Sequence, residues 1–392
     1  MNLEKFVNQY LRATRVYGMI FGTWPFQKQT QRIVGFIVVH IVLALAMITQ
    51  IGRVVVYYST RTVMEQIPFL MVATTSYVKY SNYLINASKF KRLINSLLVD
   101  RLTVGMQEEE KRIMKEYADR GKFYIFIYTL NIYFCTLVFF LLPFLPALIN
   151  IVQPLNESRP RLQIYPGYYF IENENDYYYP IMLYTNISML SAMGIFLATD
   201  TVLVFVVQHA CGLLAIAGHR FKCSLDATIS PTDCSKIDNQ ELYRNVCYAI
   251  SIHERAHAYI NEIENTYAMN LFVQVGMVVL AFTMTLLKVA SVTFSLETYQ
   301  YYGFVITQVV HMYFLTVQGQ LVIDMHENIY RAGYEAFWYN GDVKVQALFL
   351  LVMRRNLTPP LLTAGGLIQL NLDSFAEILK ASVSYFTVLK SV

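Results

Sequence analysis

The sequence predicts an all-α membrane protein with seven transmembrane helices, and three observations support this fold class. Hydrophobic residues make up 55% of the 392 residues, whereas charged residues make up only 15%, well below the about 25% of an ordinary soluble domain. The hydrophobic residues occur in runs of about 20 or more, the length that crosses a bilayer as a helix. Lys and Arg concentrate in every second connection between those runs. The net charge of +4 is small and forms no basic stripe of the kind that binds nucleic acid.

Each run is expected to form one membrane-spanning helix. The seven expected spans are 33–51, 67–85, 123–149, 180–218, 271–294, 301–323 and a more polar stretch at 361–389. The resulting division is a cytoplasmic N-terminal arm (1–32), a six-helix bundle with cytoplasmic extensions (33–323), cytoplasmic anchor helices (324–360) and a seventh membrane helix (361–392). The first thirty residues have no apolar run followed by a small-residue cleavage site, so we expect the first span to act as a signal anchor.

The positive charges orient the bundle. The N-terminal arm and the second, fourth and sixth connections hold 23 Lys and Arg, whereas the other connections and the C-terminal tail hold 5. Because positive residues accumulate on the cytoplasmic side, we expect a cytoplasmic N-terminus and an extracellular C-terminus. This orientation is the reverse of a G-protein-coupled receptor. Of the four Asn-x-Ser/Thr sequons, Asn156 alone would face the lumen clear of the membrane and could carry a glycan.

The fourth run, 180–218, is longer than a membrane needs. As a helix it would extend about 57 Å, against a hydrocarbon core of about 30 Å. It therefore either tilts strongly or projects from Asp200 to His219 into the cytoplasm, where a helical bundle or a subunit interface would have to cover its apolar residues. Further cytoplasmic helices are expected at 242–268 and 343–355.

Few residues suggest enzyme chemistry. No cysteine of the five is expected outside the cell and no C-x-x-C pair occurs, so we predict neither a disulfide framework nor a metal cluster. The segment from His253 to His257 reads H-E-R-A-H, which matches the zinc-protease pattern H-E-x-x-H. No third ligand follows, and the alternative interpretation is a polar helix face. We expect no enzyme activity, no cofactor and no metal. Lys79 and Lys288, inside predicted spans, are expected to reach an interface or a hydrated cavity.

The last span carries a polar stripe, because polar residues spaced by three and four lie on one face of a helix. These residues are Glu377, Lys380, Ser384, Thr387 and Ser391. Such a face suits a helix that lines a water-filled pore shared between subunits; contact with neighbouring helices in a monomer is the alternative. Val388 and Val392 flank the stripe and could close a pore by dewetting. Pro359–Pro360 and Gly365–Gly366 separate this helix from the one expected at 343–355.

These C-terminal residues resemble the closing signature of insect odorant receptors, and the resemblance extends essentially end to end. The signature runs through Arg355-Asn356 to Pro359, Leu362-Thr363-Ala364-Gly365-Gly366, Asn371-Leu372-Asp373-Ser374-Phe375 and Ser384-Tyr385-Phe386-Thr387-Val388-Leu389. Gly22-Thr23-Trp24-Pro25 and Phe337-Trp338-Tyr339-Asn340 also fit the family. Two residues of the pore helix depart from it: Val383 stands where many members have Tyr, and Ser374 replaces a usual Thr.

The resemblance implies a function and partners. Family members have seven helices and a cytoplasmic N-terminus, and they form tetrameric, odorant-gated, non-selective cation channels with a shared olfactory co-receptor in the plasma membrane of sensory dendrites. The cytoplasmic ends of helices four to seven form a central anchor, which would accommodate the long fourth run. By alignment, Val388 and Val392 fall at the pore constriction, with Ser391 beside it. The chain lacks the co-receptor's long insertion before the fifth span, so it resembles a ligand-tuning subunit.

The family binds its ligand in the outer half of the bundle, between helices two, three, four and six. A volatile apolar ligand needs a largely apolar, aromatic cavity with few polar anchors. The residues expected to contribute are Tyr77, Tyr80, Phe134, Leu137, Ile187, Ser188, Ser191, Tyr301 and Gln308. The 30 Tyr and 25 Phe of the chain permit such a cavity, although membrane interfaces also collect Tyr.

Two other receptor classes remain as alternatives. A gustatory-type ligand-gated channel shares the architecture, but its usual ending, T-Y followed by hydrophobic residues and Q-F, does not occur here. A G-protein-coupled chemoreceptor is disfavoured by the charge asymmetry and by the lack of E/D-R-Y after the third span and N-P-x-x-Y in the seventh. A transporter would show inverted repeats, and we detect none.

Overall fold

The computed structural model describes residues 3–103, 107–152, 161–224, 239–291, 299–336 and 338–391, which are almost entirely helical. The long helices are α3 (Gln29–Val56), α4 (Thr60–Ile85), α6 (Glu108–Leu141), α8 (Tyr178–Ser224), α9 (Asn239–Ser291), α10 (Tyr299–Glu335) and α12 (Leu372–Ser391). The short elements are α1 (Leu3–Tyr10), α2 (Arg12–Ile20), α5 (Ala87–Thr103), α7 (Leu145–Val152), α11 (Val343–Asn356), the 3-10 turns η1 (Leu142–Phe144) and η3 (Trp338–Asn340), and strands β1 (Thr363–Ala364) and β2 (Ile368–Gln369).

Each of the seven predicted spans overlaps one of the long helices. The third, 123–149, continues from α6 through η1 into α7, and residues 292–294 of the fifth lie outside the described residues. Four helical stretches, which are α3, α6 continued through α7, α8 and α9, are long and apolar enough to cross a membrane. The helical, membrane-type fold is therefore confirmed. The last helix begins at Leu372 rather than at 361, because Gly365 and Gly366 have φ of 66° and 75° and turn the chain between the antiparallel strands β1 and β2.

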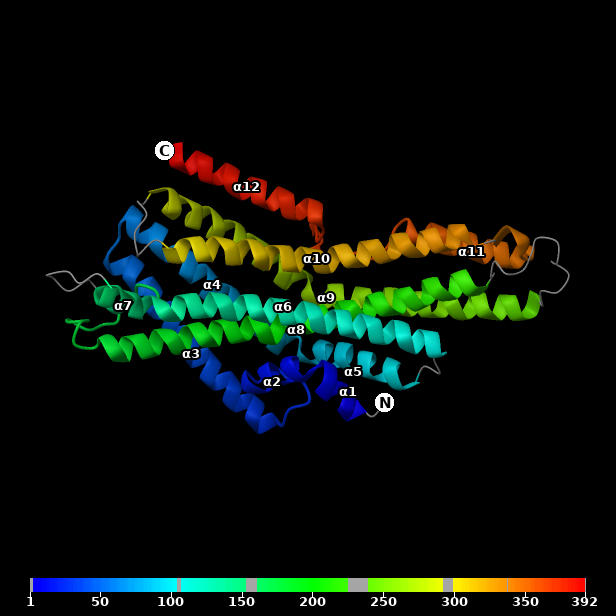
Figure 1. Ribbon diagram of the computed structural model, residues 1–392, viewed down its shortest axis with the longest axis horizontal. Coiled ribbons are helices and arrows are strands. Elements are labelled where there is room, and N and C mark those ends of the chain that lie inside the picture. The colour runs from blue at the N-terminus through cyan, green and yellow to red at the C-terminus, as the bar shows by residue number, and fades with distance from the viewer. Residues whose placement is uncertain are drawn as a thin grey trace.

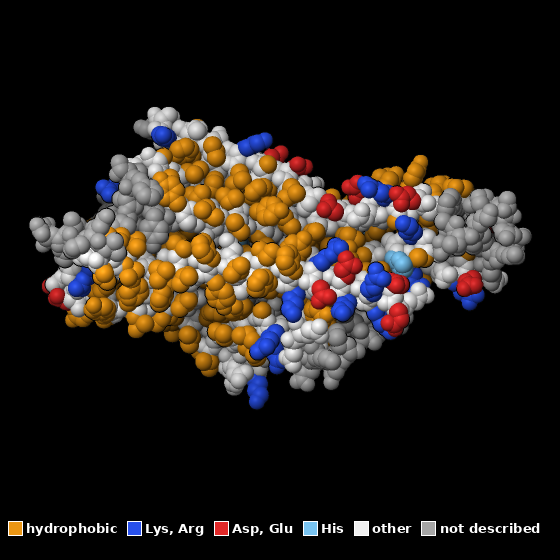
Figure 2. All heavy atoms as spheres, viewed as in Figure 1, with side chains coloured by type: hydrophobic (Ala, Val, Ile, Leu, Met, Phe, Trp, Pro, Cys, Tyr) orange, Lys and Arg blue, Asp and Glu red, His pale blue; other side chains and the backbone are white. Residues whose placement is uncertain are grey.

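The molecule has two halves with different surfaces, which we call the apolar half and the charged half. Figure 2 shows apolar side chains over one end of the elongated molecule and charges of both signs over the other. On the apolar half, large side chains such as Val34 of α3 and Phe126 of α6 are exposed. On the charged half, surface ion pairs such as Arg120–Glu116 and Arg331–Glu327 follow the helices. An apolar belt of this kind suits a bilayer, whereas the charged half suits water.

Helix α8 is the central helix, and it runs through both halves (Figure 1). Its 47 residues extend about 70 Å at 1.5 Å per residue. Almost every side chain from Gly194 to Ala217 is buried, because α8 packs against α6, α9 and α10. The projecting apolar residues that the sequence identifies, such as Val206 and Val207, are thus covered by helices of the same chain.

Local signals set the helix ends. Ser59 caps α4 by accepting a hydrogen bond from the backbone N–H of Thr62 at 3.0 Å. Gln107 and Glu110 form a capping box at the start of α6. Pro143 cannot donate a backbone hydrogen bond, so α6 gives way to the turn η1 at this point. Helix α5 lies in the connection expected at 86–122 and was not among the predicted helices.

The hairpin β1–β2 lies close against α10. A Cβ atom placed on Gly319 of α10 would lie 1.9 Å from the carbonyl oxygen of Leu370, which follows β2. The backbone N–H of Leu370 donates to the carbonyl of Leu362 at 2.9 Å. This hydrogen bond holds Leu370, and with it the carbonyl oxygen of Leu370, in place. Only glycine therefore fits at position 319.

We expect Gly319→Ala to lower the melting temperature of the receptor purified in detergent, because the methyl group must push the hairpin away from α10. Overpacking of this kind costs about 1–3 kcal/mol. Gly276→Ala in α9 is the control, since no described atom lies within 4 Å of a Cβ there. Equal melting temperatures for the two variants would contradict the close approach.

Candidate ligand-binding site

A cavity of about 110 Å³ lies inside the apolar half, between α3, α4, α6, α8, α9 and α10. Its size is comparable to an apolar cavity of about 150 Å³ that holds a benzene ring. The wall is almost wholly apolar, and each of the six helices contributes to it. The cavity therefore suits a compact, largely apolar molecule.

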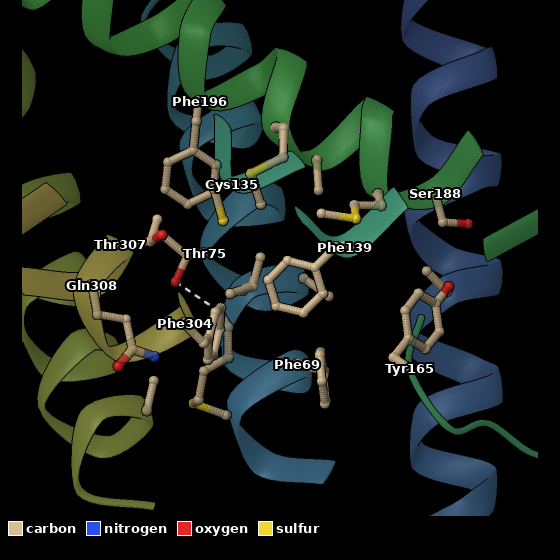
Figure 3. A pocket seen from close by; sticks show the side chains of 18 of the residues that line it. Phe69, Thr75, Cys135, Phe139, Tyr165, Ser188, Phe196, Phe304, Thr307 and Gln308 are labelled. Carbon is tan, nitrogen blue, oxygen red and sulfur yellow. Dashed lines mark hydrogen bonds between the residues drawn. The ribbon is translucent and has the colours of Figure 1, made fainter. Parts of the chain in front are cut away.

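Three phenylalanines from three helices form the centre of the wall: Phe69 of α4, Phe139 of α6 and Phe304 of α10 (Figure 3). Phe69 stacks on Phe304 with ring centroids 5.9 Å apart, and Phe139 meets Phe304 edge-on at 6.0 Å. Aromatic pairs at these separations and angles are favourable. The cluster therefore gives a ligand ring both a face and an edge to contact.

The threonines of the wall contribute little polarity. The hydroxyl of Thr75 donates to the carbonyl of Met71 at 2.7 Å, and that of Thr307 donates to the carbonyl of Gly303 at 2.9 Å. Both protons are thus engaged by the preceding turn of the same helix. The amide of Gln308 is the longer polar group, and its Nε2 donates to the hydroxyl oxygen of Thr285 at 3.4 Å.

A buried polar network adjoins the cavity through His311, which also lines it. Nδ1 of His311 lies 3.1 Å from the hydroxyl of Tyr128, and that hydroxyl donates to Oδ2 of Asp200 at 2.5 Å. Oδ1 of Asp200 accepts from Nζ of Lys79, also at 2.5 Å. The ammonium of Lys79 lies 4.7 Å from the centroid of Phe196, another residue of the wall. Four helices, α4, α6, α8 and α10, meet in this network.

The prediction that Lys79 and Lys288 reach an interface or a hydrated cavity is wrong for Lys79. For Lys288, the structure adds an ion-pair partner. Lys79 is completely buried and paired with Asp200, so it reaches neither an interface nor a hydrated cavity. Lys288 of α9 is also buried, and its ammonium lies 2.6 Å from Oε1 of Glu65 on α4. Pairing explains both positions, because an unpaired charge inside a membrane protein is costly.

The nine residues expected to contact ligand lie in different places. Ser188 and Gln308 line the cavity, and Tyr301 packs beside it with its ring 6.2 Å from that of Phe69. Tyr80 is buried away from the cavity, and its hydroxyl donates to the carbonyl of Phe21 at 2.9 Å. Ser191 is half-buried on α8. The remaining four are exposed on the outer surface, and they are Tyr77, Phe134, Leu137 and Ile187.

None of the three central phenylalanines (Phe69, Phe139, Phe304) was predicted from the sequence, and neither was His311. For Phe139 a signal existed. The inward face of α6 is the face on which polar and small residues such as Tyr128 and Cys135 recur at helical spacing, and Phe139 continues it. The more apolar face, with Phe134 and Leu137, is the exposed one. His311 had no sequence signal, since its partners Tyr128 and Asp200 are distant in the chain.

The residues expected to line a pore are on α12, which stands apart from the bundle toward its C-terminus (Figure 1). Ser384, Thr387, Val388 and Ser391 are all exposed, and the hydroxyls of Thr387 and Ser391 donate to backbone carbonyls one turn earlier. Val392 and the expected glycosylation site Asn156 lie outside the described residues.

The H-E-R-A-H segment lies in the charged half, where its histidines bond to other side chains. Nε2 of His253 lies 3.1 Å from Oδ1 of Asn356, and Nε2 of His257 lies 3.1 Å from Nε2 of His326. Burial lowers the pKa of His326 to about 4, and burial followed by the neighbouring histidines lowers the pKa of His257 further. Both imidazoles are therefore neutral, and the Nε2–H of one ring donates to the unprotonated Nε2 of the other. Among the residues that the structure describes, no group of three or more His, Cys, Asp or Glu is arranged to hold a metal ion.

Comparisons with known proteins give one consistent result. The family model described as "7tm Odorant receptor" matches residues 59–383. Odorant receptor 49a of Drosophila melanogaster is 28% identical over 78 residues, which are 20% of each chain. Odorant receptor 10 of Aedes albopictus is 26% identical over 158 residues, which are 40% of this chain and 41% of that protein. The matches thus span less than half the length of these relatives.

The fold comparison covers nearly the whole chain. The insect olfactory receptor OR5 from Machilis hrabei, in complex with eugenol, superposes with a TM-score of 0.78 over 99% of this chain and 98% of that one, at 18% identity. The structure of OR5 described without eugenol gives a TM-score of 0.77 at 19% identity. At these identities the likeness establishes the fold.

We expect Lys79→Met to destabilise the receptor strongly, because it leaves the carboxylate of Asp200 buried without its cation. Breaking such a pair costs about 3–5 kcal/mol. The double variant Lys79→Met with Asp200→Asn removes both charges and should recover most of the loss. Melting temperatures in detergent test this expectation, and a double variant as unstable as the single one would contradict the pairing.

Proposed function

The chain belongs to the odorant receptor family, and we propose that it is a subunit of an odorant-gated, non-selective cation channel that works with the olfactory co-receptor. The observation that carries the proposal is the compact, aromatic cavity of the apolar half, because a volatile apolar ligand needs such a wall with few polar anchors. The similar Machilis receptor is described in complex with eugenol. One curated relative is an odorant receptor coreceptor of Drosophila melanogaster, 22% identical over 165 residues.

Helix α10 would couple the ligand to the pore, since it contacts both the cavity and α12. Its residue His311 lines the cavity, and Tyr313, two positions further on, meets Phe375 of α12 edge-on with centroids 5.7 Å apart. Further along, the side-chain oxygen of Gln320 accepts from the backbone N–H of Leu372, the first residue of α12. A ligand favours the open state only through a higher affinity for it, so a small shift of α10 on binding would be passed to α12.

Helix α12 would line the pore together with the matching helices of sister subunits. Its polar residues Ser384, Thr387 and Ser391 are exposed in the single chain, which suits contact with water in a shared channel. A groove between α9 and α12 is lined by apolar residues such as Phe272 and Tyr385, and an exposed apolar groove of this kind suits coverage by a neighbouring subunit. The charged half would then lie in the cytoplasm of a cell whose plasma membrane holds the apolar half.

Filling the cavity should abolish or weaken the response to volatiles. We expect Ala192→Phe, on the cavity side of α8, to raise the concentration for half-maximal current at least about tenfold, since the new ring occupies ligand space. Leu190→Phe is the matched control, because Leu190 is exposed on the same helix. Currents are recorded from cells that also carry the co-receptor. Unchanged responses in Ala192→Phe at normal surface expression would contradict the ligand site.

Substitution in the proposed pore should change conduction without changing ligand binding. We expect Val388→Trp to reduce ligand-evoked current or alter its block by cations, because a larger ring narrows the constriction. Val383→Trp, also exposed but five residues earlier and therefore on another face of α12, should conduct like the unmodified receptor. Identical currents in the two variants would count against the pore assignment.

A further inference from the structure

The hydrogen-bond donors and acceptors around Asp200 determine where the protons lie. A carboxylate can only accept, and it takes one bond from Lys79 and one from the hydroxyl of Tyr128, each at 2.5 Å. The single proton of Tyr128 is thereby used. Nδ1 of His311, 3.1 Å from the same hydroxyl, must therefore be the donor to its oxygen.

The tautomer of His311 follows from the positions of these protons. Lys79 already supplies the positive charge that balances Asp200, so a second charge on the imidazole would be buried without a counter-ion. A neutral imidazole with its proton on Nδ1 carries a lone pair on Nε2. His311 is only 5% exposed and lines the cavity, and its Nε2 has no hydrogen-bond partner within the described ranges. His311 thus presents an acceptor.

Gln308 presents a second acceptor by the same reasoning. The hydroxyl of Thr285 donates its proton to the carbonyl of Ala281 at 2.6 Å, so its oxygen is left to accept from Nε2 of Gln308. This contact fixes the orientation of the amide. Its Oε1 then has no partner among the residues that the structure describes, although Gln308 is only 7% exposed. Gln308 and His311 are three positions apart on α10, so they lie on one face.

The other polar groups of the wall do not discriminate in this way. Figure 3 shows Gln308 and Thr307 on one side of the phenylalanine cluster, with Tyr165 and Ser188 on the other. The hydroxyls of Tyr165 and Ser188 can both donate and accept, so they can adapt to either kind of ligand. Gln50 of α3 also lines the cavity, and its Oε1 has no partner among the described residues, but no hydrogen bond within those residues orients its amide. The two acceptors on α10 differ because their neighbours fix their roles.

We propose that this cavity selects volatiles whose apolar body carries a hydroxyl donor, which means alcohols and phenols, over ketones and ethers of the same shape. The proposal rests on the proposed function of the cavity as the ligand site. A hydroxyl donates to Nε2 of His311 or to Oε1 of Gln308 and satisfies a buried acceptor. A ketone would place its own lone pairs against these two and satisfy neither, and a site built around such a bond rejects an analogue that lacks it.

Matched ligand pairs test the proposal. The probes are 1-phenylethanol with acetophenone, and cyclohexanol with cyclohexanone, because the members of each pair differ only at the oxygen-bearing carbon. Half-maximal concentrations are measured from currents in cells that carry the chain and the co-receptor, and thermal stabilisation is measured on the purified receptor. In each pair the alcohol should be at least about tenfold more potent and should raise the melting temperature more. Equal or greater potency and stabilisation by the ketones would overturn the proposal.

Variants of the two acceptors, Gln308→Met and His311→Phe, together with one control variant, show whether the acceptors cause the preference. Gln308→Met keeps the size of the side chain but removes an acceptor, so the potency ratio of alcohol to ketone should fall toward one. Thr307→Val is the control, because it changes a hydroxyl of the same wall that is already donated to Gly303, and it should keep the ratio. An unchanged ratio in Gln308→Met and in His311→Phe would overturn the proposal. Loss of every current, with alcohols still stabilising the purified receptor more than ketones, would contradict the channel function and support the donor preference.

Discussion

The buried ion pair between Lys79 and Asp200 is the constraint on which the rest of the apolar half depends. A charge in a membrane interior is tolerated only when it is paired and its hydrogen bonds are made, and here the pair, the hydroxyl of Tyr128 and the imidazole of His311 satisfy one another. The four residues come from α4, α8, α6 and α10. These helices can therefore hold only one relative register at this level, whereas apolar packing elsewhere in the apolar half is non-directional.

This arrangement gives the cavity one rigid end and an adaptable wall. The phenylalanine cluster of Phe69, Phe139 and Phe304 can accommodate different apolar shapes by small ring movements. The hydrogen bonds of the network, in contrast, fix the tautomer of His311, so that its Nε2 is a hydrogen-bond acceptor. Helix α10 contributes His311 and Gln308 to the cavity wall, and its Tyr313 contacts α12. The helix that would bind the ligand therefore also contacts the proposed pore helix. In the proposed function, recognition and gating thus use one element.

Much of the fold could be predicted from the sequence, because long apolar runs and helix breakers are local signals. Gly365 and Gly366 separate α12 from α11 as expected, and the long α8 is covered by helices of its own chain. The site could be predicted only in part. Phe134 and Leu137 were expected to contact ligand, but they lie on the exposed face of α6; lipid favours the more apolar face outward, so the inward face is the less apolar one. The partners Lys79 and Asp200 are 121 residues apart, and only the packing of α4 on α8 brings them together.

The most direct test of the central claim uses Cys135, a buried cysteine that lines the cavity. A small neutral maleimide is applied to the purified receptor with and without a volatile that evokes current, and alkylation of each cysteine is followed by mass spectrometry. We expect the volatile to slow alkylation of Cys135 at the concentrations that evoke current, and to leave the exposed Cys223 unaffected. Alkylation of Cys135 at the same rate under a saturating concentration of that volatile would contradict the cavity as the site where ligand binds.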